Sequence, residues 1–94
     1  LNPAVKIGRN VIINTASSVD HDCVIGDFVH VAPGVILSGG VKVGDETHIG
    51  TGATLIQNLT IGKRCTIGAG QTIRYDMADG SKSFGQGAVV NERY

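Results

Sequence analysis

The sequence predicts an all-β fold, a triangular solenoid of short parallel strands with eighteen residues per coil. A branched aliphatic residue occupies every sixth position through most of the chain: Leu1, Ile7, Ile13, Val19, Ile25, Val31, Leu37, Val43, Ile49, Leu55, Ile61, Ile67 and Ile73. A period of six fits the two-residue alternation of a strand and not the 3.6-residue period of a helix. Glycine at positions 8, 26, 44 and 62 adds a super-period of eighteen, so three hexads make one coil.

Each hexad predicts one short strand followed by a tight turn. Its aliphatic residue points into the prism, its second position is often glycine, and its fifth position is small or medium-sized. This composition suits strands and turns rather than helices. Successive coils are expected to stack at the usual interstrand spacing of about 4.8 Å.

Length and composition indicate one small domain of 94 residues, with the repeat over 1–78 and a polar capping loop over 79–94 anchored by Phe84 or Val89–Val90. The chain opens in mid-repeat at Leu1, so we expect an upstream domain that is absent from this sequence. Eight basic residues balance eight acidic ones, which argues against nucleic acid or an anionic membrane as the main partner. No apolar run is long enough to predict a membrane span.

The two cysteines, Cys23 and Cys65, both occupy the small fifth position of a hexad. Their separation of 42 residues is not a multiple of eighteen, so they are expected on different faces of the prism. A disulfide is therefore disfavoured, and a reducing, cytoplasmic setting is the simpler inference.

Residues eighteen apart should stack in columns, which places His21 and Asp22 beside Gly39 and Gly40 of the next coil. A base next to an acid, facing a glycine-lined space with accessible backbone N–H groups, is what acyl transfer requires. The alternative is that His21 and Asp22 are ordinary turn residues and that the glycines serve a loop with positive φ.

The other two histidines, His30 and His48, are expected to stack directly on each other. Because His30 is nine residues, half a coil, from His21, these two side chains should lie on opposite sides of the prism. Only a second copy of the chain could bring them into one site. His30 and His48 also raise the possibility of a metal site, against the alternative of a solvated or stacked imidazole pair.

The run VDHDCVIGDFVHVAPG, followed by GGVKVGD, IGTGATL and IGKRCTIGAG, resembles the hexapeptide-repeat acyltransferases between Val19 and Gly70. Within them it is most similar to bacterial sugar acetyltransferases of the UDP-4-amino-sugar N-acetyltransferase and sialic acid O-acetyltransferase type. The resemblance implies a left-handed β-helix and a homotrimer that binds acetyl-CoA between subunits. It further implies that His21 is the general base and that Asp22 raises its basicity.

The resemblance also implies the residues that contact acetyl-CoA. His30 would lie at the thioester, Gly39 would donate its amide to the carbonyl, and Thr51 and Ala69 would line the pantetheine track. Thr51 and Ala69 are eighteen apart and so share a column. One departure is the segment Gly85–Ala88, which lacks the proline that family members usually have in a closing turn.

We therefore expect an acetyltransferase that moves an acetyl group from acetyl-CoA to an amine or hydroxyl of a sugar or nucleotide sugar, by direct attack and without a metal. One alternative is a trimeric metalloenzyme similar to γ-carbonic anhydrase, whose usual histidine spacing is missing. The other is a non-catalytic solenoid such as an ice-binding module, although only Thr54 and Thr72 of the hexad threonines would stack. Apolar outward positions at Ile12, Val24 and Ile36 favour a homotrimer in any case.

Overall fold

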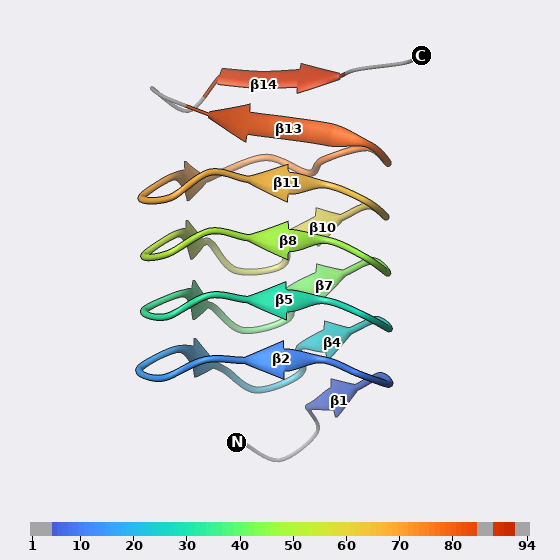
Figure 1. Cartoon of the computed structure of the whole chain (residues 1–94), viewed down its shortest axis with the longest axis vertical. Helices are drawn as coiled ribbons and strands as arrows, with labels where there is room; N and C mark the ends of the chain where they lie inside the picture. Colours follow the sequence, from blue (N-terminus) through green and yellow to red (C-terminus); the bar gives the residue numbers. More distant parts are fainter. Residues whose placement is uncertain (1–4, 85–87, 92–94) are drawn as a thin grey trace.

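The computed structural model describes residues 5–84 and 88–91, and these form strands and turns without a helix. Three walls of mainly parallel strands enclose a triangular prism whose axis runs from the N-terminus to the C-terminus (Figure 1). Wall 1 contains β1 (Lys6–Ile7), β4 (Val24–Ile25), β7 (Lys42–Val43) and β10 (Thr60–Ile61). Wall 2 contains β2 (Ile12–Ile13), β5 (His30–Val31), β8 (His48–Ile49), β11 (Thr66–Ile67), β13 (Ser81–Phe84) and β14 (Ala88–Asn91). Wall 3 contains β3 (Ser18–Val19), β6 (Ile36–Leu37), β9 (Thr54–Leu55) and β12 (Thr72–Ile73).

The strand register confirms the predicted coil of eighteen residues. Through β12 each strand pairs in parallel with the strand eighteen residues away, as His30 pairs with His48 and Ser18 with Ile36. The last turn is shorter, because Thr66 pairs with Lys82, sixteen residues away. The predicted fold class, an all-β parallel solenoid, is therefore confirmed.

The core is the column of aliphatic residues that the period of six predicts. From Val19 onward every one of them is buried, whereas Ile7 and Ile13 of the first coil are only half-buried because fewer coils cover them. Burying each such side chain stabilises the fold by about 1.5–3 kcal/mol. Thr47 replaces an apolar residue in a fifth position, where its Oγ1 donates to the Gly62 carbonyl oxygen at 2.8 Å.

Every hexad places its fourth residue in the left-handed conformation, with φ between 54° and 74° from Asn10 to Gly70. This conformation costs roughly 1–2 kcal/mol for most L-residues and less for glycine, asparagine and aspartate. Glycine, asparagine or aspartate fills most of these positions: Asn10, Asp22, Gly34, Gly40, Gly52, Asn58 and Gly70. Asp22 occupies one of these turn positions, with a backbone φ of 61°.

The C-terminal segment differs from the polar loop that its composition suggests. Ser81–Phe84 extends wall 2 as β13 and pairs antiparallel with β14. Ser81 and Ser83 are fully buried where earlier coils place apolar side chains, and Ser81 Oγ donates to the Ala78 carbonyl oxygen at 2.6 Å. A polar segment can therefore form a buried strand here, because its small serine side chains have hydrogen-bond partners inside the protein. Phe84 is half exposed rather than a buried anchor, and the side chains of Val89 and Val90 lie outside the described part.

Candidate active site

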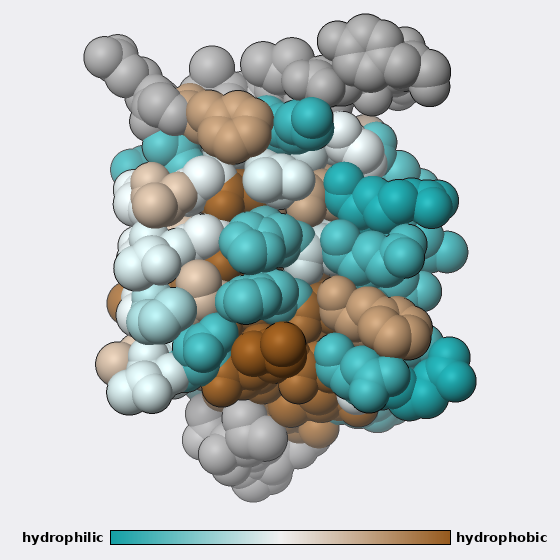
Figure 2. Space-filling view, in the orientation of Figure 1, coloured by the Kyte–Doolittle hydropathy of each residue, from teal (hydrophilic) through white to brown (hydrophobic). Residues whose placement is uncertain are grey.

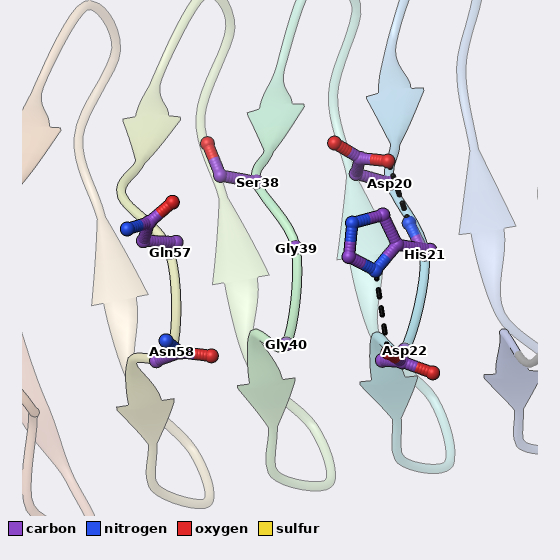
Figure 3. Close-up of a pocket in the computed structure, with 8 residues that line it drawn as sticks. All are labelled: Asp20, His21, Asp22, Ser38, Gly39, Gly40, Gln57 and Asn58. Carbon is purple, nitrogen blue, oxygen red and sulfur yellow. Dashed lines mark hydrogen bonds and ion pairs between the residues drawn. The ribbon is translucent and has the colours of Figure 1, made fainter.

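A pocket of about 400 Å³ opens at the corner between walls 3 and 1. It is built from the turns that follow β3, β6 and β9, so three successive coils contribute side by side (Figure 3). Its lining residues are Asp20, His21, Asp22, Ser38, Gly39, Gly40, Gln57 and Asn58. The columns predicted from the eighteen-residue spacing are therefore present as one surface.

Two aspartates fix the position of His21 within its turn. The Asp20 Oδ1 accepts a hydrogen bond from the His21 backbone N–H at 2.7 Å. The Asp22 Oδ2 lies 3.2 Å from His21 Nδ1 (Figure 3). A carboxylate can only accept, so this contact favours the tautomer with the proton on Nδ1 and leaves a lone pair on Nε2. The arrangement equips Nε2 to act as a base.

The contact between His21 and Asp22 orients the ring more than it stabilises the fold. The two side chains are 65% and 67% exposed, and exposed ion pairs contribute only about 0–1 kcal/mol. Both groups are therefore open to a substrate as well as to water.

Gly39 and Gly40 face this pair for two different reasons. A Cβ at Gly39 would lie 3.0 Å from His21 Cε1 and 3.1 Å from Nε2, so the missing side chain keeps the basic edge of the ring free. Gly39 is not left-handed, whereas Gly40 has φ of 74° and a Cβ there would collide with Asn58 Oδ1. The alternative interpretation, that the two glycines are present because the loop requires positive φ, is thus correct for Gly40 alone.

Among the described residues, the backbone also leaves the N–H group of Gly39 free to donate a hydrogen bond beside His21. The Gly40 N–H donates to the His21 carbonyl oxygen at 3.0 Å, and the Gly39 carbonyl oxygen accepts from Asn58 N at 2.9 Å. Within the described residues the Gly39 N–H has no hydrogen-bond partner. A free amide beside a histidine base is the arrangement that stabilises an oxyanion in acyl transfer.

Cys23 lies directly behind the pocket but is not equipped as a nucleophile. It is fully buried, and its Sγ donates to the Ser38 carbonyl oxygen at 3.2 Å. Burial raises the pKa of the Cys23 thiol, and burial likewise raises the pKa of Cys65. Both cysteines are free thiols, and thiols of raised pKa are poor nucleophiles.

The remaining predicted site residues lie elsewhere on the chain. His30 and His48 stack on wall 2, with ring centroids 4.6 Å apart. In a triangular prism, wall 2 lies opposite the corner that carries His21, as the nine-residue spacing predicts. Thr51 and Ala69 are exposed at the corner between walls 2 and 3. One chain therefore assembles His21, Asp22 and Gly39, but it does not bring the other three to them.

The corner with Thr51 and Ala69 has little side-chain bulk. Each of them precedes a left-handed glycine, Gly52 or Gly70, and a Cβ built at either glycine would meet nothing within 4 Å. The space beside these two glycines is therefore open. The segment Gly85–Ala88, which lacks the proline expected from the resemblance, lies largely outside the described residues.

Two further features concern metal and membrane. Over residues 5–84, no group of three or more histidine, cysteine, aspartate or glutamate side chains is arranged to hold a metal ion. The same part of the chain contains no helix that could cross a membrane.

Asn14 is a residue that sequence reasoning missed: its amide nitrogen lies 3.2 Å from His30 Nε2. Its position, sixteen residues from His30, falls outside the columns of eighteen.

Comparisons with known proteins agree with this architecture. Residues 40–74 match the family described as bacterial transferase hexapeptide (six repeats). The acetyltransferase domain of PglB from Neisseria gonorrhoeae is 40% identical with a TM-score of 0.80, over 85% of this chain and 48% of that chain. The same domain has also been solved in complex with acetyl coenzyme A, at 39% identity.

Two other solved structures extend the likeness. A histidine-to-alanine variant of GDP-perosamine N-acetyltransferase from Caulobacter crescentus, in complex with CoA and GDP-perosamine, is 31% identical with a TM-score of 0.89. The match covers 97% of this chain and 52% of that one. Soybean serine acetyltransferase is 30% identical with a TM-score of 0.89, over 96% of this chain and 42% of that one.

This chain spans about half the length of the first of these structures. The matches confirm the resemblance that the sequence predicts. The chain is a hexapeptide-repeat left-handed β-helix, and it shares this fold with sugar acetyltransferases and serine acetyltransferases.

Proposed function

We propose that the protein transfers an acetyl group from acetyl-CoA to an amine or hydroxyl of a sugar or nucleotide sugar. One observation supports this most strongly: His21 Nδ1 is engaged by Asp22, while the Nε2 edge faces the space left open by Gly39. The solved structures with acetyl coenzyme A, or with CoA and GDP-perosamine, support the choice of acyl donor and acceptor class.

In the proposed reaction, acetyl-CoA supplies an activated thioester. His21 Nε2 takes the proton from the acceptor nitrogen or oxygen as that atom forms its bond to the acetyl carbon. The Gly39 N–H donates to the carbonyl oxygen, on which negative charge develops. The carbon–sulfur bond then breaks, and the proton held by His21 passes to the departing sulfur. The role of Asp22 is to hold the ring and to favour the charged imidazole with its own negative charge.

We further propose that the working form is a homotrimer with its sites between subunits. His21 and His30 lie on opposite sides of one chain, so they can contribute to a single site only across a subunit boundary. Outward apolar side chains are available for such contacts: Ile12 is 53% exposed, Ile36 45% and Val24 37%. Figure 2 shows the hydrophobic surface over β2 at the lower end of wall 2, with hydrophilic surface above it. Wall 2 of one copy would then face the His21 corner of another, bringing His30, Thr51 and Ala69 toward the pocket.

We also propose a cytoplasmic location, where acetyl-CoA is available and where Cys23 and Cys65 remain free thiols.

The proposed activity is tested by a thiol-release assay with acetyl-CoA and a panel of amino-sugar nucleotides and free sugars, using the full-length protein. We expect CoA release that depends on one acceptor class and is lost in His21→Ala. Metal analysis of the same preparation distinguishes the carbonic-anhydrase alternative. Absence of release with every acceptor, or full release by His21→Ala, would contradict the proposal.

The proposed assembly is tested separately by sedimentation. We expect a trimer at micromolar concentration. A stable monomer under these conditions would contradict a site shared between subunits.

A further inference from the structure

Asn14 presents its amide group to His30 in an orientation that its neighbours determine. The amide nitrogen lies 3.0 Å from the Val31 carbonyl oxygen and 3.2 Å from His30 Nε2. A carbonyl oxygen only accepts hydrogen bonds, so the atom of Asn14 that faces Val31 must be the NH₂ nitrogen and not the amide oxygen. That nitrogen has two hydrogens, one for Val31 and one for His30.

This orientation determines which nitrogen of His30 carries the proton. Because Asn14 donates to Nε2, Nε2 must offer its lone pair, and the proton of the neutral ring then sits on Nδ1. Within the described residues Nδ1 has no hydrogen-bond partner. In the described part of the chain, every buried side-chain nitrogen or oxygen has a hydrogen-bond partner. Since Nδ1 has none, it is not buried and is accessible to solvent. His30 therefore offers a free N–H donor on wall 2.

The His30 ring is also held on its face. His48 of the next coil stacks on it with an interplanar angle of 38°, and the two residues are paired in the strand register. With one edge fixed by Asn14 and one face covered by His48, the ring has little freedom to turn and exchange its two nitrogens.

We propose that Asn14 is a positioning residue that fixes His30 in the Nδ1–H tautomer, so that Nδ1–H is the donor presented to the carbonyl oxygen of the acyl donor. The second half of this proposal rests on the proposed function, in which His30 lies at the thioester. The first half concerns the free protein and is independent of any activity.

The tautomer can be read directly by long-range ¹H–¹⁵N NMR of protein labelled at its histidines. The chain has only three histidines, and a His30→Gln variant assigns the His30 signals. We expect the Nδ1–H pattern for His30 in the free wild-type protein. In Asn14→Asp the neighbour becomes an acceptor, so we expect the proton to move to Nε2 or to occupy both nitrogens. An Nε2–H pattern in the wild-type protein would overturn the proposal.

The functional half is tested by acetyl-CoA affinity in the full-length protein. Asn14→Asp should raise the Kd by about tenfold, the effect of losing one hydrogen bond. Asn14→Ala leaves both tautomers available and should have a smaller effect of the same sign. It should also remain folded, because the Val31 carbonyl oxygen still accepts from the backbone N–H of residue 14 at 2.9 Å.

Two controls separate positioning from a general effect of charge or fold. Asn10→Asp adds the same charge on the same coil, at a left-handed position that aspartate tolerates, and should leave both the tautomer and the Kd unchanged. In a His30→Ala background, Asn14→Asp should add nothing further.

An unchanged Kd in Asn14→Asp, or an equal change in Asn10→Asp, would overturn the positioning role. Failure of the wild-type protein to bind acetyl-CoA would instead contradict the proposed function, and with it the role of Nδ1–H. The NMR result on the free protein would tell the two failures apart.

Discussion

The corner with His21 and the wall with His30 use the same side chain in opposite ways. At the corner, a carboxylate accepts from Nδ1 and leaves Nε2 with a lone pair. On wall 2, an amide donates to Nε2 and leaves Nδ1 with a proton. The comparison teaches that the neighbour, rather than the histidine, sets the chemical role: an acceptor neighbour makes a base, and a donor neighbour makes a hydrogen-bond donor.

The two regions also differ in what surrounds the ring. The His21 ring is 65% exposed and faces a space kept open by Gly39, which suits a group that must meet a substrate and move a proton. The His30 ring is half-buried between Asn14 and His48, which suits a group that stays still and binds. Substitutions at the two places should therefore affect different kinetic quantities.

The largest effect is expected at the base. His21→Ala should lower kcat by about 10²- to 10⁴-fold, the usual loss on removing a general base, while acetyl-CoA still binds. His48→Ala is the matched control for kcat, since it removes an imidazole that moves no proton in the proposed reaction and only packs on His30, and it should leave kcat nearly unchanged. Thiol release gives kcat, and isothermal titration gives the affinity. An inactive His48→Ala together with an active His21→Ala would contradict the assignment of His21 as the base and would favour a metal-binding role for His30 and His48.

The next effect is expected at the open space. Gly39→Val should reduce turnover by about 10²- to 10³-fold, because its side chain would press on the Nε2 edge of His21 and fill the space through which a carbonyl oxygen reaches the Gly39 N–H, a loss comparable with that of an oxyanion donor. Gly39 is not left-handed, so the solenoid should remain folded.

Gly40→Ala provides the contrast in the same turn. Its left-handed φ and the collision with Asn58 should destabilise the fold by about 1–2 kcal/mol, visible as a lower Tm. Wild-type turnover in Gly39→Val would show that the open space has no part in the reaction.

A smaller effect is expected when the carboxylate beside the base loses its charge. Asp22→Asn tolerates the left-handed turn but removes the group that keeps the proton on His21 Nδ1. We expect kcat to fall several-fold, because an exposed ion pair contributes only about 0.2–1 kcal/mol, and we expect acetyl-CoA affinity to stay the same. A loss equal to that of His21→Ala would mean that Asp22 acts in the chemistry itself.

The sequence predicts much of this molecule because the repeat converts sequence spacing into spatial position. The period of six predicts the core from Val19 to Ile73, and the period of eighteen by itself places His21 against Gly39. Where the repeat shortens, the prediction is wrong. Ser81 and Ser83 look like loop residues because they are polar, but they are buried in a strand because their hydroxyls have hydrogen-bond partners inside the protein. Asn14 is missed for a related reason, since its contact with His30, sixteen residues away, depends on how its side chain reaches to the next coil.

The smallest effect concerns the third corner, between walls 1 and 2, where a carboxylate holds the backbone instead of an imidazole. Asp27 Oδ1 accepts from the Arg9 backbone N–H at 2.8 Å, and Asp27 Oδ2 pairs with the Arg9 guanidinium at 3.1 Å. The backbone hydrogen bond first, and then the Arg9 side chain, lower the pKa of Asp27 below its ordinary value of 3.8.

A carboxyl whose pKa is lower in the folded state stabilises the fold fully above its unfolded pKa, and this contribution is lost as the pH falls through the folded value. Asp27→Asn should therefore lower the Tm slightly at pH 7 and by less at pH 2, while leaving kcat unchanged. Asp22→Asn should do the reverse, with reduced kcat and little change in Tm. Thermal melts at the two pH values, run beside the thiol-release assay, measure both quantities for both variants. A turnover defect in Asp27→Asn would mean that its corner also takes part in the reaction. The contrast between a stabilising carboxylate at Asp27 and a carboxylate that supports turnover at Asp22 would then be wrong.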